Sequence, residues 1–422
     1  MKPNQQAAGA EDIVIVGAGL AGLATALGLH RKGVRSLVLE SAPALRASGF
    51  AFTTWKNAFR ALDALGVGDK IRKQHLQLQA LRVISSSTGE TVQEQDLTVQ
   101  GKRLDYVDPS DAVGFRSVTD TIITLRRGPH EIRCVRRDLL LQALAEELPA
   151  DTIRYSSKIV SIEEEGSVLI GCDGINSVVA RWLGLAKPSH SGRSAARGLA
   201  HYPDGHGFEP RFLQFIGHGF RAGMLPCNEN DIYWFFTWTP SDNDKGVDES
   251  AATMKQFVLS KLRDSNVPAE ALTVIEKSEM SDVLAAPLRF RSPLSLITAN
   301  ISKGNACVAG DALHPMTPDL GQGGCSALED GVTLARCLGE AVLGGGAKGA
   351  GTENQRIETG LREYAGIRRW RSVELITTAY VIGVVQQSHD AVLSFLRDRF
   401  LSGVLARRLL KMADYDCGKL SS

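Results

Sequence analysis

Residues 13–40 begin Ile-Val-Ile-Val-Gly-Ala-Gly-Leu-Ala-Gly and end Leu-Val-Leu-Glu. The β-branched run Ile13–Val16 is typical of a buried parallel strand. Gly17 permits a tight turn, Gly19 lets the backbone approach a pyrophosphate closely, and Gly22 lets the next helix lie close to the strand. The free N–H groups at the start of that helix favour phosphate groups. The stretch therefore predicts a strand–helix–strand unit that binds a dinucleotide.

An acidic residue follows at the distance that such a site requires. Ser36–Leu39 is expected to form the second strand, and Glu40 ends it about 20 residues after the glycines. Its carboxylate can accept hydrogen bonds from a ribose hydroxyl and repels a 2′-phosphate, so FAD or NAD is favoured over NADP. Leu20 and Ala21, between the second and third glycines, are expected beside the same pyrophosphate.

The composition excludes several classes of function. The chain has 422 residues, 43% of them apolar and 23% charged, which is typical of a globular protein of more than one domain. A net charge of +1 provides no field for nucleic acid, so no such partner is expected. The seven scattered cysteines never have C-x-x-C spacing, which argues against a disulfide framework or a metal site and for a reducing compartment.

No targeting or membrane-spanning segment is expected. Residues 1–10 contain one lysine and no apolar core, unlike a signal peptide. The longest apolar stretch, near Leu375–Val385, is too short to cross a bilayer. We therefore expect a cytoplasmic protein. The tail Asp390–Met412 is amphipathic, so it could lie on a membrane surface, but packing on its own protein or on a partner is the favoured interpretation.

Two further strand ends carry glycine and aspartate. An apolar run ends at Cys172-Asp173-Gly174, with a helix expected from about Ser177. Another run ends at Gly310-Asp311, and a glycine-rich turn leads into a helix expected from about Cys325. Either junction alone is an ordinary turn. Three in order along one chain indicate one common site.

These motifs together resemble a known family. The matching segments are Gly17-x-Gly19-x-x-Gly22, Asp173-Gly174, Gly310-Asp311-Ala312-x-His314-Pro315 and the R-x-x-L-x-x-x-L pattern from Arg137. They resemble the single-component flavoprotein aromatic hydroxylases, typified by p-hydroxybenzoate hydroxylase, salicylate hydroxylase and zeaxanthin epoxidase. The amino-acid sequence of these segments is similar to that of the plant monooxygenase 1-like branch. The resemblance runs from residue 11 to about 415.

The resemblance implies an FAD site built residue by residue. The three glycines would hold the pyrophosphate, Glu40 the adenosine ribose, and Arg137 would lie beside the cofactor, although an exposed helix arginine is the alternative. The remaining implied contacts are Asp173 and Gly174, Gly310 and Asp311 at the ribityl and pyrophosphate portion, and Gly321, Gln322 and Gly323 against the isoalloxazine ring. His314 is interpreted as a structural turn residue and Cys325 as core packing.

The resemblance also implies a reaction. NAD(P)H reduces FAD, O₂ adds to give a flavin hydroperoxide, and one oxygen atom passes to a small organic, first of all aromatic, substrate. No second glycine motif exists, so NAD(P)H would dock as a co-substrate without its own domain. Flavin halogenation is disfavoured because the spacing between Trp234 and Trp238 is wrong for it. A non-catalytic binding protein stays open as an alternative.

One departure from the family motivates that alternative. After Ile153–Glu163 the family continues with a β-hairpin before the strand that leads to Asp173, whereas here only Glu164–Ser167 intervenes. A hairpin of two average strands needs roughly a dozen residues or more. The shortened link puts the crossover strands, and with them tight FAD binding, in doubt.

The expected fold class is α/β, with a Rossmann-type FAD-binding domain interleaved with an α+β substrate domain and a helical C-terminal region. Alternation in 232–239 puts Tyr233, Phe235 and Thr237 on one strand face and Trp234, Phe236 and Trp238 on the other. One face is expected to roof a pocket, with plain sheet core as the alternative. The expected boundaries are 11–80, 130–190 and 295–342 for FAD, 81–129 and 191–294 for substrate, and 343–422 for the C-terminal region.

Overall fold

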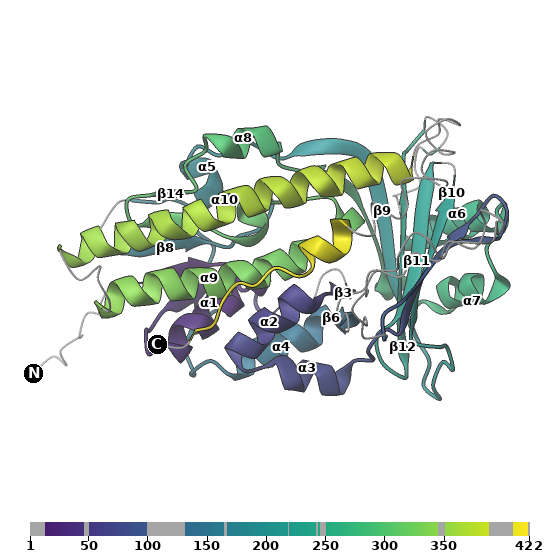
Figure 1. Cartoon of the computed structure of the whole chain (residues 1–422), viewed down its shortest axis with the longest axis horizontal. Helices are drawn as coiled ribbons and strands as arrows, with labels where there is room; N and C mark the ends of the chain where they lie inside the picture. The colour runs from purple at the N-terminus through teal and green to yellow at the C-terminus, as the bar shows by residue number, and fades with distance from the viewer. Residues whose placement is uncertain are drawn as a thin grey trace, which may run out of the picture.

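The computed structural model describes residues 13–45, 50–98, 131–163, 167–217, 219–241, 244, 250–344, 351–387 and 408–420. Two large sheets stand at opposite ends of the molecule, and two long helices run along the first of them (Figure 1). The expected α/β class with a Rossmann-type sheet is confirmed.

The first sheet has six strands in the order β14-β15-β8-β1-β2-β7. Their bounds are Ser302–Lys303 (β14), Ala306–Val308 (β15), Val168–Gly171 (β8), Ile13–Val16 (β1), Leu37–Leu39 (β2) and Ile153–Arg154 (β7). All pairings are parallel except that of β14 with β15; in the centre, Ile15 pairs with Val38 and with Ile170. The carboxyl ends of β1, β2, β8 and β15 therefore meet at one edge.

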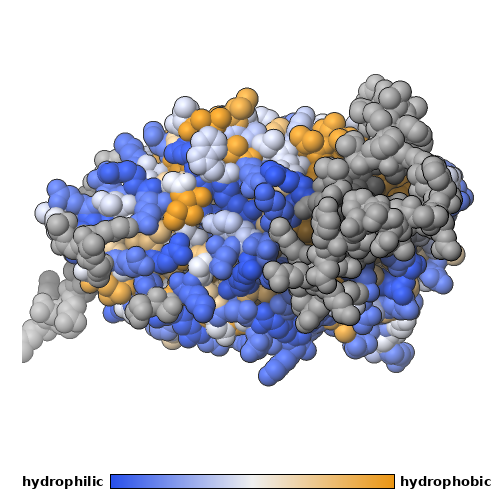
Figure 2. Space-filling model, viewed as in Figure 1, coloured by the Kyte–Doolittle hydropathy of each residue, from blue (hydrophilic) through white to orange (hydrophobic). Residues whose placement is uncertain are grey.

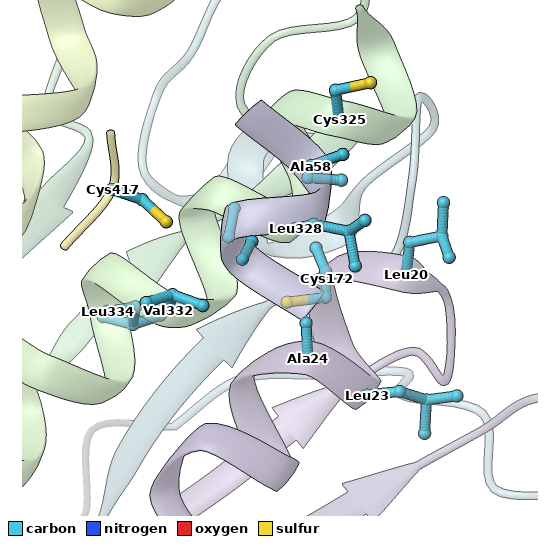
Figure 3. Packing of buried hydrophobic residues seen from close by; sticks show 14 of the residues in the cluster. Leu20, Leu23, Ala24, Ala58, Cys172, Cys325, Leu328, Val332, Leu334 and Cys417 are labelled. Carbon is cyan, nitrogen blue, oxygen red and sulfur yellow. The ribbon is translucent and has the colours of Figure 1, made fainter. Parts of the chain in front are cut away.

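Helices α1 (Leu20–Arg31) and α9 (Gly323–Leu343) pack against each other over this sheet (Figure 1). Their close approach requires glycine, because a Cβ on Gly331 would lie 2.5 Å from the Cβ of Ala24. Figure 3 shows Ala24 of α1 and Leu328 of α9 on either side of Cys172 in this core. The packing fixes the start of both helices relative to the sheet edge.

The other helices of this half complete its cover. They are α2 (Lys56–Leu65), α3 (Gly68–Gln74), α4 (Arg137–Glu146), α5 (Val178–Trp182), α8 (Pro293–Ile297), α10 (Glu353–Gln386) and the 3₁₀ turns η5 (Gly310–Ala312) and η6 (Pro318–Leu320). A two-stranded sheet pairs β3 (Ala51–Thr54) with β6 (Arg133–Arg136). Helix α10 begins at a capping box, in which Thr352 and Gln355 satisfy each other's backbone N–H groups.

The second sheet has seven strands in the order β13-β9-β12-β11-β10-β4-β5. Their bounds are Val283–Phe290 (β13), Ser189–His201 (β9), Asp231–Trp238 (β12), Phe220–Pro226 (β11), Arg211–Gly217 (β10), Ala80–Ser85 (β4) and Thr91–Asp96 (β5). Helices α6 (Ala251–Arg263) and α7 (Ala269–Lys277) and the turn η4 (Met280–Asp282) lie beyond it.

The two faces of β12 pack as the alternation predicts. Trp234, Phe236 and Trp238 belong to a core shared with α6 and α7, whereas Tyr233 and Phe235 pack with the core of the first half. The face of β12 that carries Tyr233 and Phe235 is therefore directed toward the first sheet and the elements around its edge.

Of residues 153–163, only Ile153–Arg154 forms a strand. Strands β7 and β8 both run parallel to their neighbours, so the chain between them must return across the sheet. Helix α9 begins at Gly323, two residues before the expected Cys325, since its two glycines already adopt helical geometry.

Several expectations fall outside the described residues. These are the centre of the shortened link (164–166), most of the amphipathic tail (388–407) and part of the expected substrate domain (99–129). The domain boundaries stay a prediction. In the described parts of the chain, no helix is long and apolar enough to cross a membrane.

Hydrophilic side chains dominate the visible face of the molecule, with apolar ones gathered at its upper edge over α8 (Figure 2). The exposed side chains of this turn are Leu294, at 74%, and Ile297. Two exposed apolar residues on one short helix are ordinary on a protein surface, so this patch implies no partner.

Candidate cofactor-binding site

A cleft of about 530 Å³ opens at the carboxyl ends of β1, β2, β8 and β15. Its volume and its position at the sheet edge are typical of ligand sites in doubly wound folds. Most of the residues expected to bind FAD line it, namely Gly17, Gly19, Leu20, Ala21, Glu40, Arg137, Asp173, Gly174, Gly310, Asp311 and Gly323. The fold thus brings four distant segments to one place.

Gly17, Gly19 and Gly22 differ in what a side chain at each position would meet. Gly17 has a φ of 101°, and a Cβ there would lie 2.5 Å from the carbonyl oxygen of Cys172. A Cβ on Gly22 would lie 1.9 Å from the carbonyl oxygen of Gly17, so Gly22 serves helix–strand packing and does not line the cleft. Gly19 has an ordinary extended conformation, and a Cβ there would meet no protein atom within 4 Å. Nothing in the described fold fills the space beside Gly19, so this space is open to a ligand.

Glu40 is held rigidly at the end of β2. One oxygen, Oε2, accepts a hydrogen bond of 2.9 Å from the amide of Ala18, and Oε1 accepts one of 2.8 Å from the amide of Ala42. The first bond ties the carboxylate to the glycine turn itself. A carboxylate fixed in this way is directed at the cleft, as a ribose-binding acid must be.

Asp173 and Arg137 each leave a buried polar atom without a partner in the described chain. Asp173 accepts a bond of 2.6 Å from the amide of Val178 through Oδ2, while its Oδ1 is buried and unpaired. The Nε of Arg137 is likewise buried and unpaired. Such atoms are expensive to bury, so both are suited to hydrogen bonds with a ligand in the cleft.

Arg137 begins α4 and is half-buried in the cleft lining, which does not fit the alternative of an exposed helix arginine. Burial lowers the pKa of its guanidinium, and nearby Arg197 lowers it too, while Asp311 opposes the shift. The guanidinium therefore interacts electrostatically with an exposed carboxylate on η5 and with a second arginine on β9. An anionic ligand would relieve the repulsion between the two arginines.

Gly310 and Asp311 form the turn that follows β15. Gly310 has a φ of 61°, and a Cβ there would lie 2.7 Å from the Cβ of Ala21 in α1. Only glycine fits this contact, which brings the turn close to the first helix. The side chain of Asp311 is exposed at the cleft.

Two helix N-termini face the cleft. Gly19 precedes α1 and Gln322 precedes α9, and neither helix has a side-chain cap or an acidic residue in its first turn. Gly323 and Gly324 of α9 line the cleft. The free N–H groups and the positive ends of both helices therefore favour anionic groups there. Together with the open space at Gly19 and the unpaired atoms above, this fits a dinucleotide such as FAD.

Gly321 and Gln322 lie beside the cleft rather than in its lining. Gly321 ends η6 with a φ of 61°, and a Cβ there would lie 3.3 Å from Thr53. Gln322 is fully buried, and its Oε1 accepts a bond of 2.8 Å from Nδ2 of Asn57. Their expected contact with an isoalloxazine ring stays a prediction.

Other residues of the lining had no clear signal in the sequence. The polar ones are Ser41, Ser157, Lys158 and Asn176, and small ones are Gly324 and Ala327. Ser41 directly follows Glu40, and Asn176 lies two residues after Gly174, so their proximity to the site could be inferred. Lys158 lies in an irregular segment after β7, and only the folded structure places it here.

His314 and Cys325 have the structural roles expected of them. His314 is fully buried, with Nε2 2.6 Å from Oδ2 of Asp330. Cys325 is fully buried in α9, and burial raises the pKa of its thiol to about 12. A thiol of this kind is a packing group.

A buried ion pair joins the second sheet to the turn before α9. The guanidinium of Arg193 on β9 binds the carboxylate of Asp319 in η6 through two bonds of 2.9 and 2.8 Å. Arg221 on β11 donates to the carbonyl oxygen of Asp319 at 3.3 Å. A bidentate contact fixes geometry well, so the second sheet is held in register with the segment Gly321–Gly323.

Comparison with known proteins agrees with this geometry. A family model described as "FAD binding domain" matches residues 10–356. The chain is 48% identical over 432 residues to Monooxygenase 2 of Arabidopsis thaliana, covering 98% of each chain. It is 33% identical to Monooxygenase 1 of the same plant, covering 97% of this chain and 99% of the relative. The structure of HpxO from Klebsiella pneumoniae complexed with FAD and uric acid superposes with a TM-score of 0.75 at 22% identity, covering 96% of each chain.

Proposed function

Because the chain belongs to the FAD-dependent monooxygenase family, we propose that it binds FAD non-covalently in this cleft and uses NAD(P)H to insert one oxygen atom from O₂ into a small aromatic metabolite. The observation that carries the proposal is the open space at Gly19 between two uncapped helix N-termini. FAD, when bound, supplies the redox chemistry and the activation of O₂. The protein would bind and orient the cofactor and the substrate, and it would exclude water from the site.

Different residues of the cleft would bind different parts of the cofactor. The turn at Gly17–Gly19 and the start of α1 would hold the pyrophosphate, and Glu40 the adenosine ribose. Asp311 and the unpaired Oδ1 of Asp173 are placed to accept hydrogen bonds from hydroxyl groups between the two ends. The N-terminus of α9 would stabilise negative charge on the reduced flavin.

A cationic pocket beside the cleft supports NAD(P)H as the co-substrate. It has a volume of about 170 Å³, and its charged lining residues are all basic: Arg181, Lys187, Arg289 and Arg291. It shares Asn176 with the cleft, and Nη1 of Arg289 donates to Oδ1 of Asn176 at 3.1 Å. A positively charged pocket without acidic lining residues is suited to the phosphates of a nicotinamide dinucleotide.

The second sheet supports a small aromatic substrate. Arg197 on β9 pairs across the sheet with Phe235 of β12, on the face that looks toward the first half. Tyr233 lies on the same face, and burial raises the pKa of its hydroxyl to about 12, so it stays a neutral donor. Aromatic rings and a cation on one face suit a ring that carries an acidic group.

A second candidate function is a binding protein without catalysis. The observation that favours it is the link between Arg154 and Val168, in which the described residues contain no hairpin. The alignment with Monooxygenase 2 is longer than this chain, so that relative has residues without a counterpart here. On this hypothesis FAD binds weakly or not at all.

The absorption spectrum of the purified protein tests both candidates. We expect a yellow protein whose flavin is released into the supernatant by acid precipitation, because no flavin-linking residue is recognisable. NADH and NADPH oxidation should then rise when phenols or aromatic acids are added, with O₂ consumed. A colourless protein that takes up no added FAD would contradict the monooxygenase proposal, and flavin retained in the acid pellet would contradict non-covalent binding alone.

A further inference from the structure

We propose that Asp330 is a positioning residue for FAD: from inside α9 it holds the turn Gly310–Asp311 at the cleft, and Arg368 of α10 keeps it there. The proposal rests on FAD binding in the cleft and concerns a residue that does not line it. Three observations carry it: the contacts of Asp330, the charge balance around it and its connection to the start of α9.

The contacts of Asp330 tie three elements together. Its Oδ2 accepts a hydrogen bond of 2.7 Å from the backbone amide of Gly310 and lies 2.6 Å from Nε2 of His314. Its Oδ1 accepts a bond of 2.5 Å from Nε of Arg368. The amide of Gly310 is the first N–H of the turn, so the position of the carboxylate decides where Asp311 meets the cofactor.

The acidic side chains of this cluster lie against basic ones within the protein core. Glu329 and Asp330 are adjacent on α9, and both are fully buried. Arg368 lies 2.8 Å from Glu329 Oε2 through Nη1, and Nη2 of Arg371 lies 2.9 Å from Glu329 Oε1. Two carboxylates therefore face two guanidinium groups. Burial alone would raise the pKa of Asp330, but His314 and Arg368 lower it below its usual value, so the carboxylate is charged at neutral pH.

Through Asn57, the same cluster also contacts Gln322, which precedes the N-terminus of α9 at the cleft. Oε1 of Glu329 accepts a bond of 2.6 Å from Nδ2 of Asn57, which also donates to Oε1 of Gln322 at 2.8 Å. Gln322 immediately precedes the N-terminus of α9. Adjacent carboxylates on one helix thus hold the Gly310 turn and the approach to the flavin end of the cleft.

The C-terminal segment covers the cluster. Nη2 of Arg371 donates to the carbonyl oxygen of Met412 at 2.8 Å, and the guanidinium carbon lies 4.4 Å from the ring centroid of Tyr415. Cation–π contacts of desolvated arginine are stabilising. The cluster therefore relates the cleft to α10 and to the end of the chain.

The test compares Asp330→Asn with Leu334→Ala in the full-length protein. Leu334 is fully buried one turn further along α9 and does not line the cleft, so its variant controls for loss of core packing. The FAD dissociation constant and the melting temperature of the apoprotein are measured for each, together with the midpoint potential of the bound flavin. A hydrogen bond to a charged group corresponds to roughly tenfold or more in affinity.

We expect Asp330→Asn to raise the FAD dissociation constant at least about tenfold and to shift the flavin potential. Leu334→Ala should lower the melting temperature with little change in either FAD property. If Asp330→Asn does not fold, the double variant Asp330→Asn/Arg368→Gln removes both charges and takes its place. Unchanged FAD affinity and potential in a folded Asp330 variant would overturn the proposal, whereas a wild type that binds no FAD would instead overturn the proposed function.

Discussion

Two glycines of one motif should have opposite phenotypes when they are replaced. Gly19 and Gly22 are three residues apart, yet a Cβ on Gly19 meets nothing within 4 Å, and a Cβ on Gly22 lies 1.9 Å from the carbonyl oxygen of Gly17. We expect Gly19→Val to abolish FAD binding and leave the apoprotein folded. We expect Gly22→Ala to destabilise the apoprotein itself.

The magnitudes follow from the local geometry. At Gly19, φ is −80° and ψ is −175°, a conformation open to any residue. Reduced flexibility of the unfolded chain should stabilise Gly19→Val by about 0.4–1 kcal/mol, and a poorer N-cap should offset this by a similar amount. The free energy of unfolding of the apoprotein should therefore change by less than about 1 kcal/mol. At Gly22 the clash is with backbone, so we expect a loss of about 1–3 kcal/mol or more.

Thermal unfolding with and without FAD separates the two effects. Free FAD at 100 times its dissociation constant should stabilise the wild type by about 2.7 kcal/mol, and Gly19→Val should show no such gain. Gly22→Ala should melt lower than the wild type even without FAD. The reasoning is refuted if Gly19→Val retains wild-type FAD affinity, or if its apoprotein is destabilised as strongly as that of Gly22→Ala.

Three further outcomes test other parts of the site. Asp311→Ala should weaken FAD binding without lowering the melting temperature of the apoprotein, since its side chain is exposed at the cleft; equal affinity would remove it from the site. Cys325 should resist iodoacetamide at pH 7 to 9 in the folded protein, because burial raises its pKa to about 12 and the thiolate forms only above that range; labelling seen by mass spectrometry would contradict its burial. Inserting a family-type hairpin between Glu165 and Val168 should lower the FAD dissociation constant and raise the melting temperature, and equal values for both forms would show that the short link is harmless.

The cofactor unit could be predicted because its signals are local. Gly17, Gly22 and Gly310 are needed because a Cβ would clash with a neighbouring turn or helix, and the sequence pattern records them directly. Strand ends also meet at one edge whenever the strands are parallel. Asp173 and Asp311 could therefore be assigned to one site without knowledge of the packing.

The rest of the site depends on contacts that no sequence pattern records. The expected contact of Gln322 with the ring stays a prediction, and the bond that its amide oxygen accepts comes from Asn57, 265 positions earlier in the chain. In the sequence, nothing distinguishes Asp330 from an ordinary helix residue. Only the packing of α10 against α9 brings Arg368 beside it. Lys158 reaches the cleft from an irregular segment. These placements follow from tertiary packing, which local propensity does not determine.

Strand β8 forms although the link before it is too short for the family's hairpin. Residues 155–167 must bring the chain from the carboxyl edge at β7 back to the amino edge at β8, because both strands are parallel to their neighbours. Extended, they reach roughly 43 Å, and four-residue strands are only about 13 Å long, so β8 forms and Asp173 reaches the cleft. The described part of the link, residues 155–163 and 167, forms no strand that could add a second layer. A cavity of about 350 Å³ accordingly lies beside the link, lined by Ile162, Leu169 and Trp182 among others, and Val160 is 87% exposed. Parallel sheets are ordinarily covered on both faces. The missing hairpin should therefore act on FAD through the stability of the sheet and not through a misplaced Asp173.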